Sequence, residues 1–321
     1  MSLSAHDLGV SSLNLEIVDG KLVVYSSYAK ADLGSFAART SPEDLKAFTA
    51  NAIKIEVDGK PLDLLENEVF IDAADGLNLR HSFGEVAGKE IRVTSFLPSM
   101  LSSNHVQILK LIRNNKEISR QFLTGEKNEF VFDLNDIQTP TTFGQFLTLG
   151  IKHITFGLDH LLFLFALLLV VTQFREIAKI ATFFTIAHSI TLALVVLNVI
   201  SIPSFLVEPV IALSIIYVGL ENIFKPDQKR RWLVAYIFGL VHGLGFASIL
   251  TEIGIGKGMA AVIPLFSFNL GVELGQFAII LLVLPFLWKL QKQAYYKTIF
   301  VPICSILIAL AGLYWFVERT L

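Results

Sequence analysis

The sequence predicts an α-helical membrane protein of about six transmembrane helices, preceded by an all-β, sandwich-like extracytoplasmic domain. The 321 residues are 53% hydrophobic and 17% charged, whereas about a quarter of an average soluble protein is charged. The mean hydropathy is +0.61, and nearly all of the apolar excess follows residue 140. Before that point, apolar and polar residues alternate with the period of two of a strand. We therefore divide the chain into residues 1–138 and 139–321.

Short strands separated by turns are expected throughout the first domain. Asp19-Gly20 and Asp58-Gly59 each interrupt an alternating run, and a two-residue Asp-Gly loop is typical of a β-hairpin. The expected strands are 13–18, 22–28, 53–57, a run ending at Leu65, 68–72, 90–96, 105–113, 118–123 and 129–134. We expect the last two to form a hairpin. Seven or more short strands favour an antiparallel sandwich.

Other features of the first domain are few. Residues 41–48 are expected to form a short helix, with Ser41 as its N-cap and Pro42 at its first position. We find no catalytic constellation here and interpret His81 and His105 as solvated or hydrogen-bonded side chains.

Six apolar segments follow, at about 146–171, 177–199, 205–224, 231–251, 260–287 and 298–317. Each is long enough to cross a hydrocarbon core of about 30 Å at 1.5 Å per residue. Lysines and arginines gather in the connections after the first, third and fifth segments, whereas those after the second and fourth contain only Lys257. The positive-inside rule then places the odd connections in the cytoplasm. We expect a multi-pass inner-membrane protein whose β-domain and C-terminus lie outside the cytoplasm.

Export of the β-domain ahead of the first span needs a signal peptide, and residues 1–9 contain no apolar segment of that kind. We expect that the signal peptide is missing from this sequence and that Ala5 and His6 lie near the mature N-terminus. The net charge of −2 gives nucleic-acid binding no electrostatic support. The single cysteine, Cys304, cannot form an intrachain disulfide.

Ionisable side chains lie inside several of the apolar segments. Such groups are costly at membrane depth and therefore indicate function. Counting along the spans places His160, His188, His242 and Glu273 near the middle of the bilayer, with Asp159 and Asn269 within one turn. The remaining polar candidates are Glu208 toward the outer mouth, Glu221 toward the cytoplasmic end, and Gln276, which can be explained by helix packing alone.

His153 and His160 are seven residues apart, which predicts about 10 Å along one helix face. We therefore place His153 nearer the outer mouth, where it would not easily share an ion with His160. Imidazole and carboxylate together suit nickel, zinc, cobalt or copper(II) rather than magnesium or calcium. A single membrane histidine is usually a hydrogen-bond partner, but several at one depth favour a metal or proton-coupled site.

Small residues accompany these groups and permit close helix contacts. They are Gly157, Ser189, Gly239, Gly243, Gly245, Gly271 and Gly275. The pair at 271 and 275 has the G-x-x-x-G spacing of a helix-contact motif. Close contacts of this kind would bring short imidazole side chains within reach of one ion.

These motifs together resemble those of the HupE/UreJ family of membrane proteins. They are H-x3-G-x-D-H at 153–160, AHS at 187–189, VEP at 207–209, GLEN at 219–222, GLVHGLGFA at 239–247 and FNLGVELGQ at 268–276. The β-domain resembles that of the family's longer branch. Shorter members typically have proline after the first histidine, where this chain has Ile154. The resemblance implies a divalent-metal permease, with nickel supplied to hydrogenase or urease and the histidine–aspartate motif as the metal contact.

The leading hypothesis is therefore binding or transport of a divalent transition metal, nickel or zinc. His153 would capture the ion, Asp159, His160, His188 and His242 would hold it, and Glu273 with Asn269 would complete or relay the site. We favour this non-enzymatic role.

Two alternatives compete with it. The first is an intramembrane zinc-dependent hydrolase, similar to alkaline ceramidases and adiponectin-receptor-like proteins, with Asp159, Ser189 and Glu273 as catalytic residues. The second is a membrane-anchored assembly protein that binds a periplasmic or membrane partner through its β-domain.

Overall fold

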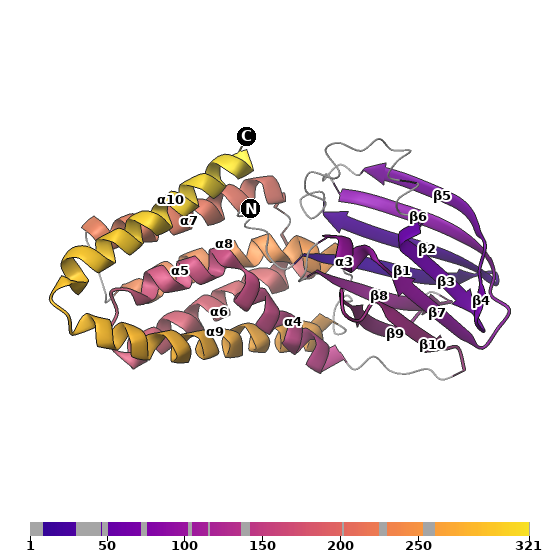
Figure 1. Ribbon diagram of the computed structural model, residues 1–321, viewed down its shortest axis with the longest axis horizontal. Helices are drawn as coiled ribbons and strands as arrows, with labels where there is room; N and C mark the ends of the chain where they lie inside the picture. Colours follow the sequence, from indigo (N-terminus) through magenta and orange to yellow (C-terminus); the bar gives the residue numbers. More distant parts are fainter. Residues whose placement is uncertain are drawn as a thin grey trace. The chain divides into compact units, whose positions relative to one another are not determined.

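The computed structural model describes residues 9–29, 46, 51–71, 76–101, 105–114, 116–135, 142–200, 202–224, 230–252 and 261–320. The chain divides into two compact units, Leu8–Thr142 and Phe143–Leu321, and each has a hydrophobic core of its own. The first unit is built from strands and the second from helices (Figure 1). The helix expected at 41–48 lies outside the described residues, apart from Lys46.

Two β-sheets form the first unit, together with the short helix α3 (Leu97–Leu101). The larger sheet has the strand order β5 (Leu64–Ile71), β6 (Gly76–Glu85), β2 (Lys21–Ala29), β1 (Val10–Val18), β8 (Val106–Arg113) and β9 (Lys116–Leu123). The smaller sheet has the order β10 (Glu129–Asp133), β7 (Glu90–Ser95), β3 (Ile53–Val57) and β4 (Lys60–Pro61). Buried residues of both sheets, such as Leu13 and Val93, belong to one hydrophobic cluster.

Turn chemistry explains the two hairpins. Asp19 and Gly20 have φ angles of 50° and 79°, and Asp58 and Gly59 have 49° and 75°. Two successive residues with positive φ form the type I′ turn that matches the twist of paired strands. The antiparallel pairs β1–β2 and β3–β4 follow, so both Asp-Gly hairpins are confirmed.

Three expectations about the strands are wrong. Strands β9 and β10 do not pair with each other, because a turn closed by hydrogen bonds between Thr124 and Lys127 passes the chain from one sheet to the other. Strand β6 was not expected, although Leu79 and Phe83 alternate with polar residues and face the core. Finally, β1 pairs with β8 in parallel, Val10 opposite Val106.

Neither histidine of the β-unit is solvated, since both are 1% exposed. His105 Nε2 forms a hydrogen bond of 2.8 Å with Ser11 Oγ, as the hydrogen-bonded interpretation expects. Neither nitrogen of His81 has a hydrogen-bond partner among the described residues. Burial lowers the pKa of both imidazoles to about 4, so they are neutral at pH 7.

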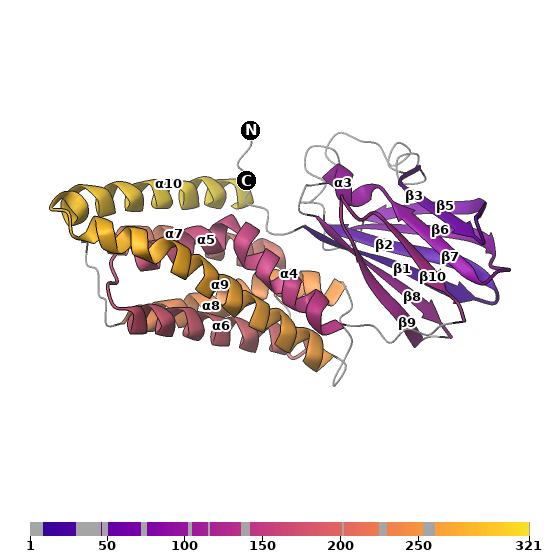
Figure 2. The ribbon, with the colours of Figure 1, turned by 60° about the horizontal axis from the view of Figure 1, so that its bottom comes forward.

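The second unit consists of helices α4 (Thr142–Phe156), α5 (Leu158–Leu168), α6 (Phe174–Val196), α7 (Ser204–Phe224), α8 (Arg231–Glu252), α9 (Val262–Gln291) and α10 (Val301–Thr320), with a π-helical turn at Tyr296–Phe300 before α10 (Figure 2). Within the described residues, four helical segments are long and apolar enough to cross a membrane, and the bent pair α4–α5 makes a fifth. Helix α8 is apolar over the shorter range Arg231–Ala247. The unit is therefore that of a multi-pass membrane protein, with four to five candidate spans among the described residues.

The first expected span is broken in its middle. Gly157 separates α4 from α5 with an extended ψ angle of 96°, and the two helices meet at 67°. The first residues of α5 are held by a local contact, because the Asp159 carboxylate accepts the backbone N–H of His160 at 2.8 Å. The prediction of one straight helix over 146–171 is wrong, and this break shapes the site described below.

Side chains from other helices satisfy the carbonyl groups at the end of α5 and in the following loop. The bonds run from Asn222 and Arg231 to Ala166, from Arg231 to Leu167, from Tyr296 to Leu169, from Gln291 to Val171 and from Trp288 to Thr172. Backbone polar groups at membrane depth need such partners. The short helix is therefore fixed at its C-terminal end by the protein itself.

Glycines bring the helices that carry the histidines into close contact. A Cβ atom on Gly271 would collide with the carbonyl oxygen of Leu147, and one on Gly150 with that of Phe268. On α8, a Cβ on Gly243 would lie 2.6 Å from the carbonyl oxygen of His188. The expected close packing through small residues is confirmed for α4 against α9 and for α6 against α8.

Candidate metal centre

Three buried histidines from three helices meet in the second unit. His153 of α4, His160 of α5 and His188 of α6 each offer one ring nitrogen, and these three nitrogens lie within 4.8 Å of one another. Their exposed fractions are 0%, 3% and 0%. We call these three residues the histidine cluster.

The helix break at Gly157 creates this cluster. The rings of His153 and His160 have their centroids 4.6 Å apart, not the 10 Å that one straight helix would give. The expectation that His153 lies apart at an outer mouth is therefore wrong. The two helices meet at 67°, and one ring nitrogen of each histidine lies within 4.8 Å of the other.

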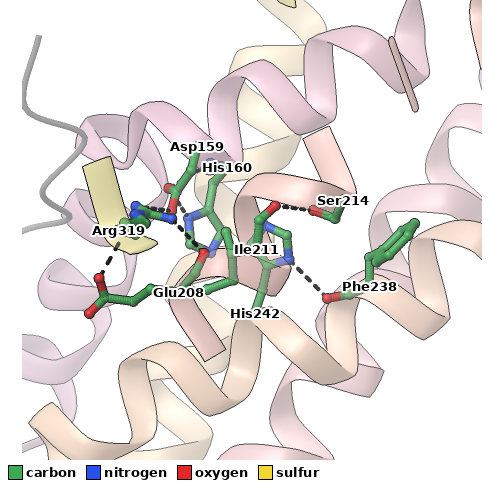
Figure 3. A network of polar contacts seen from close by, with 8 residues as sticks. All are labelled: Asp159, His160, Glu208, Ile211, Ser214, Phe238, His242 and Arg319. Carbon is green, nitrogen blue, oxygen red and sulfur yellow. Dashed lines mark hydrogen bonds and ion pairs between the residues drawn. The ribbon is translucent and has the colours of Figure 1, made fainter. Parts of the chain in front are cut away.

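His242 of α8 lies beside the cluster. Its ring centroid is 4.8 Å from that of His160, and its Nδ1 donates to the carbonyl oxygen of Phe238 at 2.8 Å (Figure 3). Because a carbonyl can only accept, this bond assigns the proton to Nδ1 and leaves a lone pair on Nε2. No described residue forms a hydrogen bond with His242 Nε2.

A similar bond orients His188. The amide nitrogen of Asn269 donates to the carbonyl oxygen of Leu265 at 2.8 Å, so its Oδ1 faces His188 Nδ1 at 3.3 Å. The imidazole therefore donates from Nδ1 and keeps a lone pair on Nε2. Among the described residues, His188 Nε2 also has no hydrogen-bond partner.

Asp159 contacts the Nδ1 atom of the His160 ring. Its Oδ1 accepts from the Nδ1 of His160 at 2.8 Å (Figure 3), and it is not among the three residues whose ligand atoms converge. A carboxylate that holds one ring nitrogen while the other faces an ion is the usual outer support of a metal-binding histidine. The arrangement gives Asp159 the position of an orienting group.

Aromatic rings surround the cluster. His153 packs on Phe246 with centroids 4.2 Å apart and lies 5.4 Å from Phe268, and His188 stacks on Phe184 at 6.1 Å. Sequence reasoning did not find these three phenylalanines, since phenylalanine is common in any membrane span. Electrostatic contacts are stronger in such an apolar, buried environment than at the protein surface.

Glu273 and Gln276 each accept a hydrogen bond from a threonine of α6. Glu273 accepts from the Thr182 hydroxyl at 3.0 Å and does not belong to the cluster. Gln276 accepts from Thr185 at 2.9 Å. Together with Asn269, these residues form a row between α6 and α9, which we call the polar seam: Thr182, Thr185, Asn269, Glu273 and Gln276.

Glu221 and Glu208 each lie near an arginine side chain. Glu221 Oε2 lies 3.6 Å from Arg231 Nη2, in the group that holds the end of α5. Glu208 Oε2 lies 3.8 Å from Arg319 Nε, and Arg319 Nη2 lies 3.7 Å from Asp159 Oδ2 (Figure 3). Sequence reasoning missed Arg319 as a site residue, because a cation at the end of the last span looks like an ordinary loop charge.

The fold and the cluster together define a multi-pass membrane protein with a buried, imidazole-rich centre in its helical unit. The sequence profile of the family described as HupE / UreJ protein matches residues 128–319, which is more than half of the chain. The chain therefore belongs to the HupE/UreJ family. No curated protein shows a significant match to it.

Proposed function

We propose that the protein binds a divalent transition-metal ion at the histidine cluster and passes it across the membrane. The observation that carries this proposal is the convergence of one nitrogen each from His153, His160 and His188 within 4.8 Å. Three imidazoles form a ligand set suited to nickel or zinc. His242 would supply a fourth nitrogen and Asp159 would orient His160.

Helix directions support a route through the site. Thr182 and Thr185 precede His188 in α6, and Glu273 and Gln276 follow Asn269 in α9. The polar seam therefore leaves the cluster toward the N-terminal end of α6, which the positive-inside rule assigns to the cytoplasm. Polar groups on both sides of a midplane site are what a permease needs and what a dead-end catalytic cavity lacks.

The hydrolase alternative receives less support from the same geometry. Ser189 donates to the Thr185 carbonyl at 2.6 Å, Asp159 binds His160 and Arg319, and Glu273 binds Thr182. These three proposed catalytic residues have separate partners and do not converge on one point. We therefore favour transport over hydrolysis.

We also propose six membrane passages, with the bent pair α4–α5 as the first and α8 as the fourth. An even number of passages would place the β-domain, proposed as a sandwich, and the C-terminus on the same outer side. Cysteines introduced singly at Lys257 and Lys292 test this arrangement. An impermeant thiol reagent added to intact cells should label the first position and not the second; the reverse pattern would contradict it.

Metal uptake tests the proposed function. Purified protein in vesicles should accumulate nickel or zinc, and equilibrium titration in detergent should show one bound ion per chain. His160→Ala should weaken binding at least tenfold and abolish uptake, because it removes one of three converging ligands. Ser189→Ala should retain both, since its hydroxyl faces a backbone carbonyl. A His160→Ala protein that binds and transports like the parent would refute the proposal.

A further inference from the structure

A row of charged side chains leads from the surface of the helical unit to the histidine cluster. The side chain of Glu208 is 41% exposed, that of Arg319 11%, that of Asp159 5% and that of His160 2%. Each member contacts the next at 2.8 to 3.8 Å (Figure 3). This is a graded path from an accessible carboxylate to a buried ligand.

Arg319 joins three helix ends along this path. It comes from the last turn of α10 and reaches Asp159 in the first turn of α5 and Glu208 near the start of α7. It also donates from Nη1 to the backbone carbonyl of Glu208 at 3.1 Å. One guanidinium with five donors can hold both acids at once or move between them.

The position of this cation matters because of its charge. A guanidinium 3.7 Å from the carboxylate that orients His160 repels a divalent ion approaching by way of Glu208. On the other side of the cluster, Asn269 contacts His188, and the polar seam continues with the uncharged Thr185 and Gln276 and the acidic Glu273. The arginine therefore lies on one side of the cluster, and none of the described residues of the polar seam on the other side is a cation.

Helix directions place the two mouths at opposite ends. The short connection from α6 to α7 puts the start of α7, and with it Glu208, at the C-terminal end of α6. The polar seam runs the other way, toward the N-terminal end of α6. The charged row and the seam therefore approach the histidine cluster from opposite directions.

We propose that Arg319 is a gate beside the metal site, which closes the route while it bridges Glu208 and Asp159, as it does in this structure, and opens it when it releases Asp159 and stays on Glu208 alone. The proposal rests on the proposed function, namely that the histidine cluster binds a divalent cation. Glu208 attracts the incoming ion and retains the guanidinium when that group leaves Asp159. Arg319 is thus a positioning residue and not a ligand.

The test measures association rates and equilibrium affinity for zinc or nickel, using the full chain in nanodiscs. Arg319→Gln keeps an amide donor but removes the charge, and we expect association to become about tenfold faster, as for other charges that control ion access. The equilibrium affinity should stay the same or increase. Arg319→Lys should behave more like the parent than Arg319→Gln does. Glu318→Gln, an exposed neighbour on α10, is the matched control and should change neither quantity.

A second variant keeps the proposal testable if Arg319→Gln does not fold. Glu208→Gln leaves Asp159 as the sole acid for the arginine, so association should slow about tenfold. Weaker equilibrium binding by Arg319→Gln at an unchanged association rate would show that the arginine merely orients Asp159, and would overturn the gate alone. A parent protein that binds neither metal would instead overturn the proposed function.

Discussion

Buried histidines occur in both units of the protein, but only those of the helical unit meet. In the β-unit, His105, just before β8, bonds to Ser11, and His81 of β6 has its ring centroid 6.4 Å from that of Phe83 on the same strand. In the helical unit, three histidines converge within 4.8 Å and His242 lies beside them. Burial alone therefore does not indicate a site; convergence of lone pairs from separate elements does.

The largest predicted effect is a loss of metal binding, which should distinguish the histidines of the helical unit from those of the β-unit. His188→Ala should eliminate stoichiometric zinc or nickel binding or weaken it at least tenfold, because one of three converging nitrogens is lost. His105→Ala should leave the stoichiometry and affinity unchanged. Metal analysis after dialysis and competition with a chelating dye measure both. Equal losses in the two variants would contradict the distinction drawn here.

A smaller effect is expected from the packing that brings the helices together. Gly271→Ala forces a methyl group against the Leu147 carbonyl oxygen, and overpacking of this kind typically costs about 1–3 kcal/mol. Thermal unfolding in detergent should shift to lower temperature, and metal affinity should fall because α4 carries His153. Gly144→Ala on α4 is the control, since a Cβ there meets nothing within 4 Å. If both variants unfold alike, close α4–α9 contact does not support the cluster.

The smallest predicted effect is a pH-dependent loss of stability of the β-unit, caused by His81 and His105. Burial lowers the pKa of His81 and of His105 to about 4, from an unfolded value of about 6.5. The unfolded chain therefore takes up protons first, and stability falls as the pH drops from 6.5 to 4. By pH 5.5, each histidine should cost the β-unit about 1.4 kcal/mol.

Hydrogen exchange of the strand amides, expressed as protection factors at pH 7.0 and 5.5, measures this loss. His81→Leu removes one titrating group and should reduce the pH dependence by about half. A variant with the full pH dependence of the parent would show that His81 is not one of the groups responsible.

The sequence predicted those parts of the fold that depend on residues adjacent in the chain. The hairpins at Asp19-Gly20 and Asp58-Gly59 were predictable because two adjacent residues determine a type I′ turn. The approach of His160 to His188 was predictable, because both lie at a similar depth in apolar segments. The placement of β9 and β10 in different sheets was not predictable, since the sequence from Thr124 to Lys127 is compatible with a hairpin as well as with a crossover to the other sheet.

Two features of the site could not be predicted for a related reason. A single glycine in an apolar run, such as Gly157, is compatible with a straight helix as well as a broken one, and the bend depends on packing against other helices. The contact between Arg319 and Asp159 joins residues 160 positions apart, and a pair so distant leaves no periodic pattern in one sequence.

The length of α5 has an electrical consequence. Eleven residues extend about 16 Å at 1.5 Å per residue, which is roughly half of a 30 Å hydrocarbon core. An ion at His160, near the start of this helix, would therefore sense about half of the transmembrane voltage. For a divalent cation this amounts to about 2.3 kcal/mol per 100 mV. If the proposed transport function and membrane topology hold, a negative cell interior would draw the ion toward the histidines and then toward the cytoplasm, so that metal uptake should depend on membrane polarisation even without a second coupled ion.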